Sequence, residues 1–464
     1  MVRFVYMLAL RRLPQKCSSI CPVPYLRHGG FRPLSPFGGK EQGTEASTAI
    51  EEPSSVDPVI RESKRKIHVR KEKSESIVSQ TVLPPKLVTC EGDWSVNDNR
   101  KAKDTRVLIK DLKRNLRRNK SGSRWYLLDQ DIAKKFVTHL NKGLKESDII
   151  VESSPGPGVL TEILLTQTNN KVIAYEPQDI LRSNLEKSLL PRYPSSLQIY
   201  DYDLEKFYAH YIIDRKEPEK SILEKFLKPM PIKGDGKDSP VKITGIIHDI
   251  KFFFRLILSF AFQCCFYEEI FPDLYLFIPK GIYNRIAFDS ENFIFRNISV
   301  PFQFYFHLEC LEVVSREGFY PPYTQHSKGK FAREKHMHLV KISPNEDIFK
   351  EVPKKELISF HYFMNTVSRI KRTETLIMCL EKWIPDCGPQ LIKNGLHVFS
   401  HPRDLTKEQL LLAYSIFISL PSFEESVFHY QWRQYAARYG EKDEEVPQLN
   451  LTEGVSVMED QELL

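Results

Sequence analysis

The sequence predicts an α/β protein in which a mostly parallel sheet, covered by helices on both faces, is followed by an all-helical region. Between residues 148 and 344, short apolar segments alternate with segments of helical periodicity, which is typical of parallel strands joined by crossover helices. From about Phe349 onward, apolar residues recur only at helical spacing. A chain of 464 residues with 41% hydrophobic residues can form two domains plus tails.

The elements follow in a regular order, interrupted once by a charged stretch at 205–240. The last two strands suit an antiparallel pair at an edge of the sheet. Thr406 and Gln409 have the spacing of a capping box at a helix start. The predicted strands are 148–153, 171–176, 196–203, 241–250, 273–279, 309–322 and 335–344; the predicted helical segments are 159–167, 179–190, a helix from Lys251, 355–384 and 406–440.

Composition limits the class of protein. The net charge of +7 favours a polyanionic partner only weakly. The eight cysteines show no C-x-x-C metal spacing, so we expect them to be reduced. The apolar run 252–266 is too short to span a bilayer and contains Arg255, which predicts a buried helix and no membrane insertion.

The two ends of the chain differ in composition from the rest. Residues 1–40 contain seven Lys/Arg and no acid, which favours a mitochondrial transit peptide over a secretory signal or a disordered basic tail. Residues 41–99, rich in Ser, Pro, Glu and Lys, predict a disordered linker. The tail 441–464 has eight acids against one Lys and is also expected to be disordered.

The segment from Arg106 to Arg118 places basic residues three or four apart on one helical face. It is either a solvated surface or a face that follows nucleic-acid phosphates, and both readings stay open.

The segment "DIIVESSPGPGVLTEILL" carries the clearest binding signal. Gly156 and Gly158 can adopt positive φ and allow close approach of a ligand. The turn follows the first strand and precedes a helix N-terminus, where open α/β sheets bind ligands. The next strand ends in Glu176, which could accept hydrogen bonds from ribose hydroxyls, and the third in Asp203, which could meet an adenine amino group.

These residues resemble the S-adenosylmethionine-dependent rRNA adenine dimethyltransferase family. The segment 124–137 is similar to the family's Q-N-F-L-x-D element, with Leu127 and Asp129 matching it. The segment 318–344 looks like a modified F-x-P-x-P-x-V-D-S followed by the last strand. The family's E-x-G-P-G-x-G-x-L-T pattern is met by Glu152, Pro155, Gly156, Gly158, Leu160 and Thr161.

The resemblance implies a Rossmann-like S-adenosylmethionine-dependent methyltransferase fold with a mainly helical C-terminal domain. It assigns the cofactor S-adenosyl-L-methionine to five residues: Leu127, Gly156, Gly158, Glu176 and Asp203. We expect a transit peptide at 1–40, a linker at 41–99, a methyltransferase-like domain at 100–348 with an insertion at 205–240, a helical domain at 349–440 and an acidic tail at 441–464.

The chain departs from the family pattern where methyl transfer occurs. The N-L-P-Y that holds the target adenine should follow the fourth strand, but the sequence there is "TGIIHDIKFFF". Ser154 replaces the first Gly of the motif, and Arg124 replaces the cofactor-proximal Gln. Because transfer needs the nucleophile held near the methyl group, we assign no catalytic residue. We expect weak or vestigial cofactor binding and at most a secondary methyltransferase activity.

Together these features resemble the transcription-type (second) paralogue of the mitochondrial transcription factor B branch. That resemblance implies an initiation factor that helps the mitochondrial RNA polymerase melt promoter DNA, in the matrix nucleoid. Its partners would be the polymerase, promoter DNA and the HMG-box mitochondrial transcription factor A. The alternative is a dimethyltransferase of two adjacent adenines in mitochondrial small-subunit rRNA, which would make that rRNA a partner.

A nucleic-acid contact is expected near residue 370. By the resemblance, Arg369, Lys371 and Arg372 fall where the family contacts DNA, on a helix whose aromatic residues we expect to be core. His336 and His338 share one strand face, and we expect structural histidines rather than a metal site. The aromatic residues in question are Phe360, Tyr362 and Phe363.

Overall fold

The computed structural model describes residues 124–234, 239–287, 298–322, 333–371 and 373–439. Four predictions lie outside these residues: the transit peptide at 1–40, the linker at 41–99, the basic helix at 106–118 and the acidic tail at 441–464. Arg372 is also outside them.

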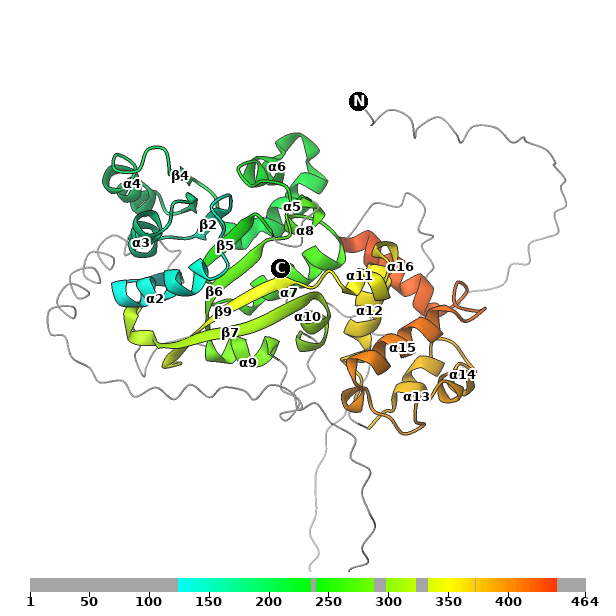
Figure 1. Cartoon of the computed structure of the whole chain (residues 1–464). Helices are drawn as coiled ribbons and strands as arrows, with labels where there is room; N and C mark the ends of the chain where they lie inside the picture. Colours follow the sequence, from blue (N-terminus) through cyan, green and yellow to red (C-terminus); the bar gives the residue numbers. More distant parts are fainter. Residues whose placement is uncertain (1–123, 235–238, 288–297, 323–332, 372, 440–464) are drawn as a thin grey trace, which may run out of the picture. The chain divides into compact units, whose positions relative to one another are not determined.

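A seven-stranded sheet forms the centre of the described chain, in the order β4-β3-β2-β5-β6-β9-β7 (Figure 1). The first five of these strands are parallel to one another, and β9 is antiparallel to both β6 and β7. The strands are β2 (Ile149–Ser153), β3 (Lys171–Tyr175), β4 (Leu197–Tyr200), β5 (Val241–Ile246), β6 (Asp273–Pro279), β7 (Phe306–Ser315) and β9 (His336–Pro344). The predicted sheet and its antiparallel edge pair are confirmed.

Alternate residues of the strands enter two hydrophobic cores, because successive side chains of a strand point to opposite faces. Ile150 and Val172 pack in one core, with residues of α2, α3 and α4. Val151 and Ile173 pack in the other, with residues of α5 to α8. The first set of helices is α2 (Gln130–Asn141), α3 (Val159–Gln167) and α4 (Asp179–Ser188); the second is α5 (Phe207–Lys216), α6 (Ile222–Leu227), α7 (Ile250–Ala261) and α8 (Phe266–Glu269).

The charged stretch at 205–240 contains helices in its described part, α5 and α6, rather than only a loop. Phe207 and Phe226 from these helices are fully buried and in ring contact with Phe266. The stretch therefore belongs to the core. In the described part of the chain, every helix is too short or too polar to cross a membrane.

The remaining elements follow the same alternation and then become helical. A small second sheet pairs β1 (Tyr126–Leu127) with β8 (Phe319–Tyr320). The other helices are α9 (Lys280–Ile286), α10 (Ser299–Tyr305), α11 (Ile348–Glu351), α12 (Leu357–Val367), α13 (Leu376–Glu381), α14 (Gly388–Lys393), α15 (Lys407–Ile418) and α16 (Val427–Tyr439); five short 3₁₀ turns are Leu204–Lys206, Pro218–Lys220, Arg316–Gly318, Lys354–Glu356 and Pro402–Asp404. The predicted capping box of Thr406 and Gln409 is confirmed at α15.

Helix α12 ends earlier than the sequence predicts. Helix α12 ends at Val367, so Arg369 and Lys371 lie in the turn before α13 and not on the helix. Near this end, the hydroxyls of Thr366 and Ser368 donate to backbone carbonyls three or four residues back, a local bond that competes with continued helix. The prediction of core aromatics is confirmed for Phe360 and Phe363, both fully buried.

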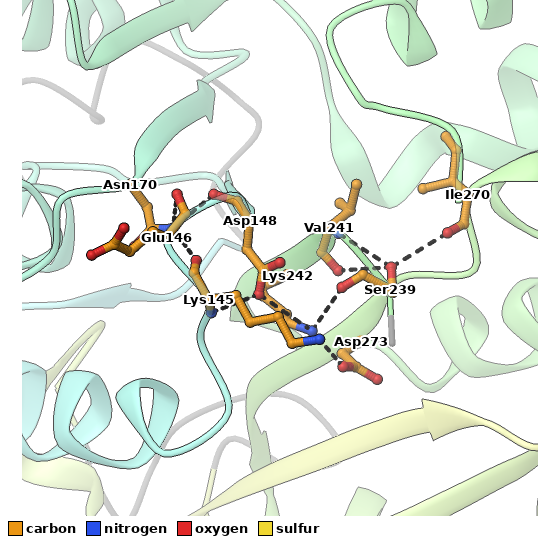
Figure 2. Close-up of polar contacts among 9 residues, drawn as sticks. All are labelled: Lys145, Glu146, Asp148, Asn170, Ser239, Val241, Lys242, Ile270 and Asp273. Atoms are coloured by element: carbon orange, nitrogen blue, oxygen red, sulfur yellow. Dashed lines mark hydrogen bonds and ion pairs between the residues drawn. The ribbon is translucent and has the colours of Figure 1, made fainter. Parts of the chain in front are cut away.

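A buried charge cluster ties together the amino ends of three strands (Figure 2). Lys242 of β5 donates from Nζ to Ser239 O and Asp273 Oδ2, both at 2.8 Å, and lies 3.8 Å from Asp148 Oδ2. Asp148 accepts from the Lys145 backbone N–H, and Asn170 donates to the Asp148 carbonyl. We call these residues the amino-end cluster.

Candidate functional site

The predicted binding residues meet at the carboxyl edge of the sheet. The chain runs outward from β2 to β3 and β4, then crosses to the other side of β2 as β5. The loop after β2 therefore lies at the point where strand order reverses, which is where open α/β sheets bind ligands. Glu176 follows β3 directly, and Asp203 follows β4 by three residues.

Glu176 fastens the Gly-rich loop to the end of β3. Its carboxyl oxygens accept the backbone N–H groups of Gly156 at 2.8 Å and Gln178 at 2.9 Å. The side chain is fully buried, and burial raises the pKa of Glu176 to about 7, against the lowering effect of the two hydrogen bonds. The predicted ribose acceptor thus has a structural task as well.

The two glycines of the loop are required by conformation and by space. Gly156 has φ of 64° and Gly158 has φ of 84°. A Cβ on Gly156 would meet the Tyr126 ring at 2.2 Å, and one on Gly158 would meet Leu185 at 2.6 Å. Tyr126 is buried and covers the loop that the resemblance assigns to the cofactor.

The two replaced positions of the motif contact each other. Arg124 Nη1 donates to Ser154 Oγ at 2.6 Å and to Glu205 Oε1 at 3.2 Å, and its Nη2 pairs with Asp203 Oδ2. Ser154 has φ of 51°, in the region that costs a non-glycine residue roughly 1–2 kcal/mol. The serine therefore keeps the backbone of the glycine that it replaces.

The charges around Arg124 reinforce one another. Burial lowers the pKa of the Arg124 guanidinium, but the carboxylates of Asp203 and Glu205 outweigh that effect, and the pKa lies above its ordinary value. Burial also raises the pKa of Glu205 to about 7, although Arg124 opposes the rise. The cation holds both acids at the edge of the site.

Glu152 on β2 has one carboxyl oxygen without a hydrogen-bond partner in the described chain. It is buried, and its Oε2, like Ser153 Oγ, has no hydrogen-bond partner among the described residues. Burial raises the pKa of Glu152 to about 8. A cationic ligand would stabilise this carboxylate.

The described residues fit S-adenosylmethionine in part. The cofactor brings an ammonium and a sulfonium group, which suit the Glu152 carboxyl with its unpartnered Oε2 among the described residues. The Asp203 carboxylate, which the resemblance assigns to the adenine amine, is already paired with Arg124.

The end of β5 is occupied by a stack of side chains. After Ile246, the segment reaches His248, whose ring stacks on Trp125 with centroids 5.2 Å apart and planes 12° from parallel. The Arg316 guanidinium carbon lies 3.7 Å from the centroid of the Trp125 ring. Burial lowers the pKa of His248 to about 4, so its imidazole is neutral at pH 7.

Arg316 is a buried cation with no acid beside it in the described part of the chain. The residue is 2% exposed, and its Nε and Nη1 lack hydrogen-bond partners there. Burial lowers the pKa of Arg316 to about 10, so the guanidinium stays charged at neutral pH. Its contacts are the rings of Trp125 and Phe319, and such cation–π contacts compensate desolvation only in part.

A sequence profile identifies the protein family of this chain. The profile described as ribosomal RNA adenine dimethylase matches residues 115–378, more than half of the chain. The chain belongs to this family.

Two named methyltransferases are similar to this chain at low sequence identity. Dimethyladenosine transferase 2, mitochondrial, of Drosophila melanogaster is 24% identical over 364 residues, covering 67% of this chain and 79% of that protein. Ribosomal RNA small subunit methyltransferase A of Francisella tularensis subsp. tularensis is 25% identical over 205 residues, covering 44% of this chain and 65% of that protein.

Two solved structures are similar as well. A dimethyladenosine transferase from Plasmodium falciparum gives a TM-score of 0.44 at 17% identity and covers 63% of this chain and 98% of that one. The 23S rRNA methyltransferase ErmE gives 0.41 at 13% identity and covers 63% and 99%. The family match and the strand order of the sheet confirm the predicted Rossmann-like methyltransferase fold for this dimethylase family member.

The structure brings Gly156, Gly158, Glu176 and Asp203 to one edge of the central sheet, whereas Leu127 lies on β1 and packs in the core with residues of α2; all five residues are buried. Sequence reasoning missed the contacts that Arg124 makes and the stack of His248, Trp125 and Arg316. The sequence held one signal of the contact between Arg124 and Ser154, because the chain departs from the dimethylase pattern at both positions. The predicted residues are Leu127, Gly156, Gly158, Glu176 and Asp203.

Two of the predicted nucleic-acid residues, Arg369 and Lys371, lie among the described residues, in the turn between α12 and α13. Lys371 is exposed and Arg369 is half-buried.

His338 stacks on Tyr283 with ring centroids 4.6 Å apart, and burial lowers the pKa of His338 to about 4. Among the described residues, no group of three or more His, Cys, Asp or Glu could hold a metal ion.

Proposed function

We propose that this dimethylase family member is a mitochondrial transcription initiation factor of the transcription factor B type, which helps the mitochondrial RNA polymerase melt promoter DNA. The end of β5 carries the proposal. A dimethylase needs groups there that hold the adenine amine in line with the methyl donor. This chain has Ile246–Asp249 at that place, with His248 stacked on Trp125. A family fold without its base clamp is suited to holding nucleic acid rather than alkylating it.

Several features support the rest of the proposal. The relative from Drosophila melanogaster is named as mitochondrial, and residues 1–40 have the composition of a transit peptide. We place the protein in the matrix nucleoid. Its proposed partners are the polymerase, promoter DNA and the HMG-box mitochondrial transcription factor A. Arg369, Lys371 and Arg372 would contact the backbone of an unpaired strand.

Promoter opening tests this function directly. Run-off transcription is measured on a closed linear promoter with the polymerase and the HMG-box factor, with and without this protein. A template carrying a pre-melted bubble is the matched control, on which the dependence on this protein should largely disappear. Equal run-off yield with and without the protein on the closed template would refute the proposal.

A second function, dimethylation of two adjacent adenines in mitochondrial small-subunit rRNA, is favoured by two observations. The family and the Drosophila relative are named for adenine dimethylation, and the Glu152 Oε2 that lacks a partner in the described chain suits a cationic cofactor. Methyl incorporation into the rRNA hairpin that is lost in Glu176→Ala would establish it. No incorporation above a heat-treated control would exclude it.

A further inference from the structure

The Arg124 side chain connects three segments at the cofactor edge. Its guanidinium contacts Ser154 after β2, Asp203 after β4 and Glu205 in the following 3₁₀ turn. The side chains of Arg124, Asp203 and Glu205 are 14%, 8% and 15% exposed. A guanidinium paired with two carboxylates in such a place forms strong, directional hydrogen bonds.

The pairing involves the acid that an adenosyl group would need. Asp203 Oδ2 accepts from Arg124, and Asp203 Oδ1 accepts the backbone N–H of Glu205. An incoming adenine amine therefore has to compete with a cation of the chain itself. The neutral amino group of adenine is a weaker partner for a carboxylate than a guanidinium is.

We propose that Arg124 and Ser154 form a lock that excludes the adenosyl half of S-adenosylmethionine by holding Asp203. Arg124 supplies the competing cation, and the Ser154 hydroxyl accepts from the same guanidinium and fixes its direction. The two departures from the family motif act as one device. The lock concerns the cofactor edge alone, so it applies whichever of the two functions the protein performs.

A neutral side chain at position 124 should free Asp203 Oδ2 from its buried cation, although the exposed Lys206 Nζ stays 3.7 Å away. A glycine at position 154 should remove the second anchor. Binding of S-adenosylhomocysteine is measured by calorimetry for the full chain and for Arg124→Gln, Ser154→Gly, the double variant and Arg124→Lys. We expect the double variant to gain about tenfold or more in affinity, the order of one charge-assisted contact. Arg124→Gln should gain part of this, and Arg124→Lys should stay near the unmodified chain because it keeps the cation.

A folded double variant, judged by circular dichroism and its Tm, that binds no more tightly than the unmodified chain would overturn the lock. If the double variant does not fold, Arg124→Ala decides by competition. Free guanidinium ion at millimolar concentration should then weaken S-adenosylhomocysteine binding to Arg124→Ala but not to the unmodified chain. Equal effects on both proteins would also overturn the proposal. Neither readout depends on promoter opening, so this test and that of the proposed function fail separately.

Discussion

The two ends of the central sheet handle buried charge in opposite ways. At the amino end, Lys242 is paired with Asp273 and bonded to the Ser239 carbonyl (Figure 2). At the carboxyl end, Glu152 has an unpartnered oxygen and Arg316 has unpartnered nitrogens, within the described residues. The first arrangement satisfies its polar groups, and the second leaves several of them without a partner.

This difference separates stability from binding. Buried polar groups are nearly always satisfied, and unsatisfied ones concentrate where a protein binds or reacts. The left-handed Ser154 lies at the same end of the sheet as Glu152 and Arg316. The amino-end cluster thus holds strand starts together, whereas the carboxyl end keeps the strained geometry of a binding edge.

The largest effect should come from breaking the amino-end cluster. Lys242→Met leaves Asp273 and Asp148 without their buried cation, and loss of one partner from a buried ion pair costs about 3–5 kcal/mol. We expect the free energy of unfolding, measured in urea, to fall by that amount.

Arg316→Met is the matched control for Lys242→Met, since both remove a buried cation. Arg316 lacks an acid partner in the described chain, so its removal leaves no unpaired carboxylate and should not lower stability comparably. A similar loss in the two variants would contradict the comparison between the sheet ends.

The next effect concerns pH. Burial raises the pKa of Glu152 to about 8 and of Glu176 to about 7. The folded state then binds more protons than the unfolded state above about pH 4.5, so stability is full below that pH and falls as pH rises through the folded pKa. In Glu152→Gln, the fall of the free energy of unfolding with pH should become shallower by up to roughly 1.4 kcal/mol per pH unit between pH 5 and 8.

Urea unfolding at several pH values measures this slope, and the exposed Glu186→Gln serves as the control. The slope of Glu186→Gln should match that of the unmodified chain. An unchanged slope in Glu152→Gln would mean that Glu152 is ionised and paired in the folded protein.

Much of the fold could be predicted from the sequence because strands and turns are local signals. The segments "DIIVES" and "KVIAYE" are short, apolar and followed by turn or helix signals, and both form strands in the structure. The helices at 205–240 escaped prediction because charged residues dominate the stretch, while the few aromatics that bury it, Phe207 and Phe226, are widely spaced.

The site was harder to predict for a physical reason. Gly156, Glu176 and Asp203 lie at strand ends, and parallel strand order brings such residues together. Arg124 lies outside the central sheet, so its partners depend on the direction of its side chain. The pattern of residues along the sequence does not contain that information. The stack on Trp125 likewise joins residues from three distant segments.

The smallest expected effect tests whether the helical region contacts nucleic acid. Neutralising Arg369, Lys371 and Arg372 to Gln removes up to three phosphate contacts, and each one lost should lower the salt slope of single-stranded DNA binding by about 0.7. Affinity is measured by fluorescence anisotropy from low to physiological salt. The control neutralises three exposed lysines elsewhere, so the change in net charge is the same. If both triple variants lose the same slope, the binding depends on net charge, and the basic turn after α12 has no specific contact. The control residues are Lys142, Lys187 and Lys216.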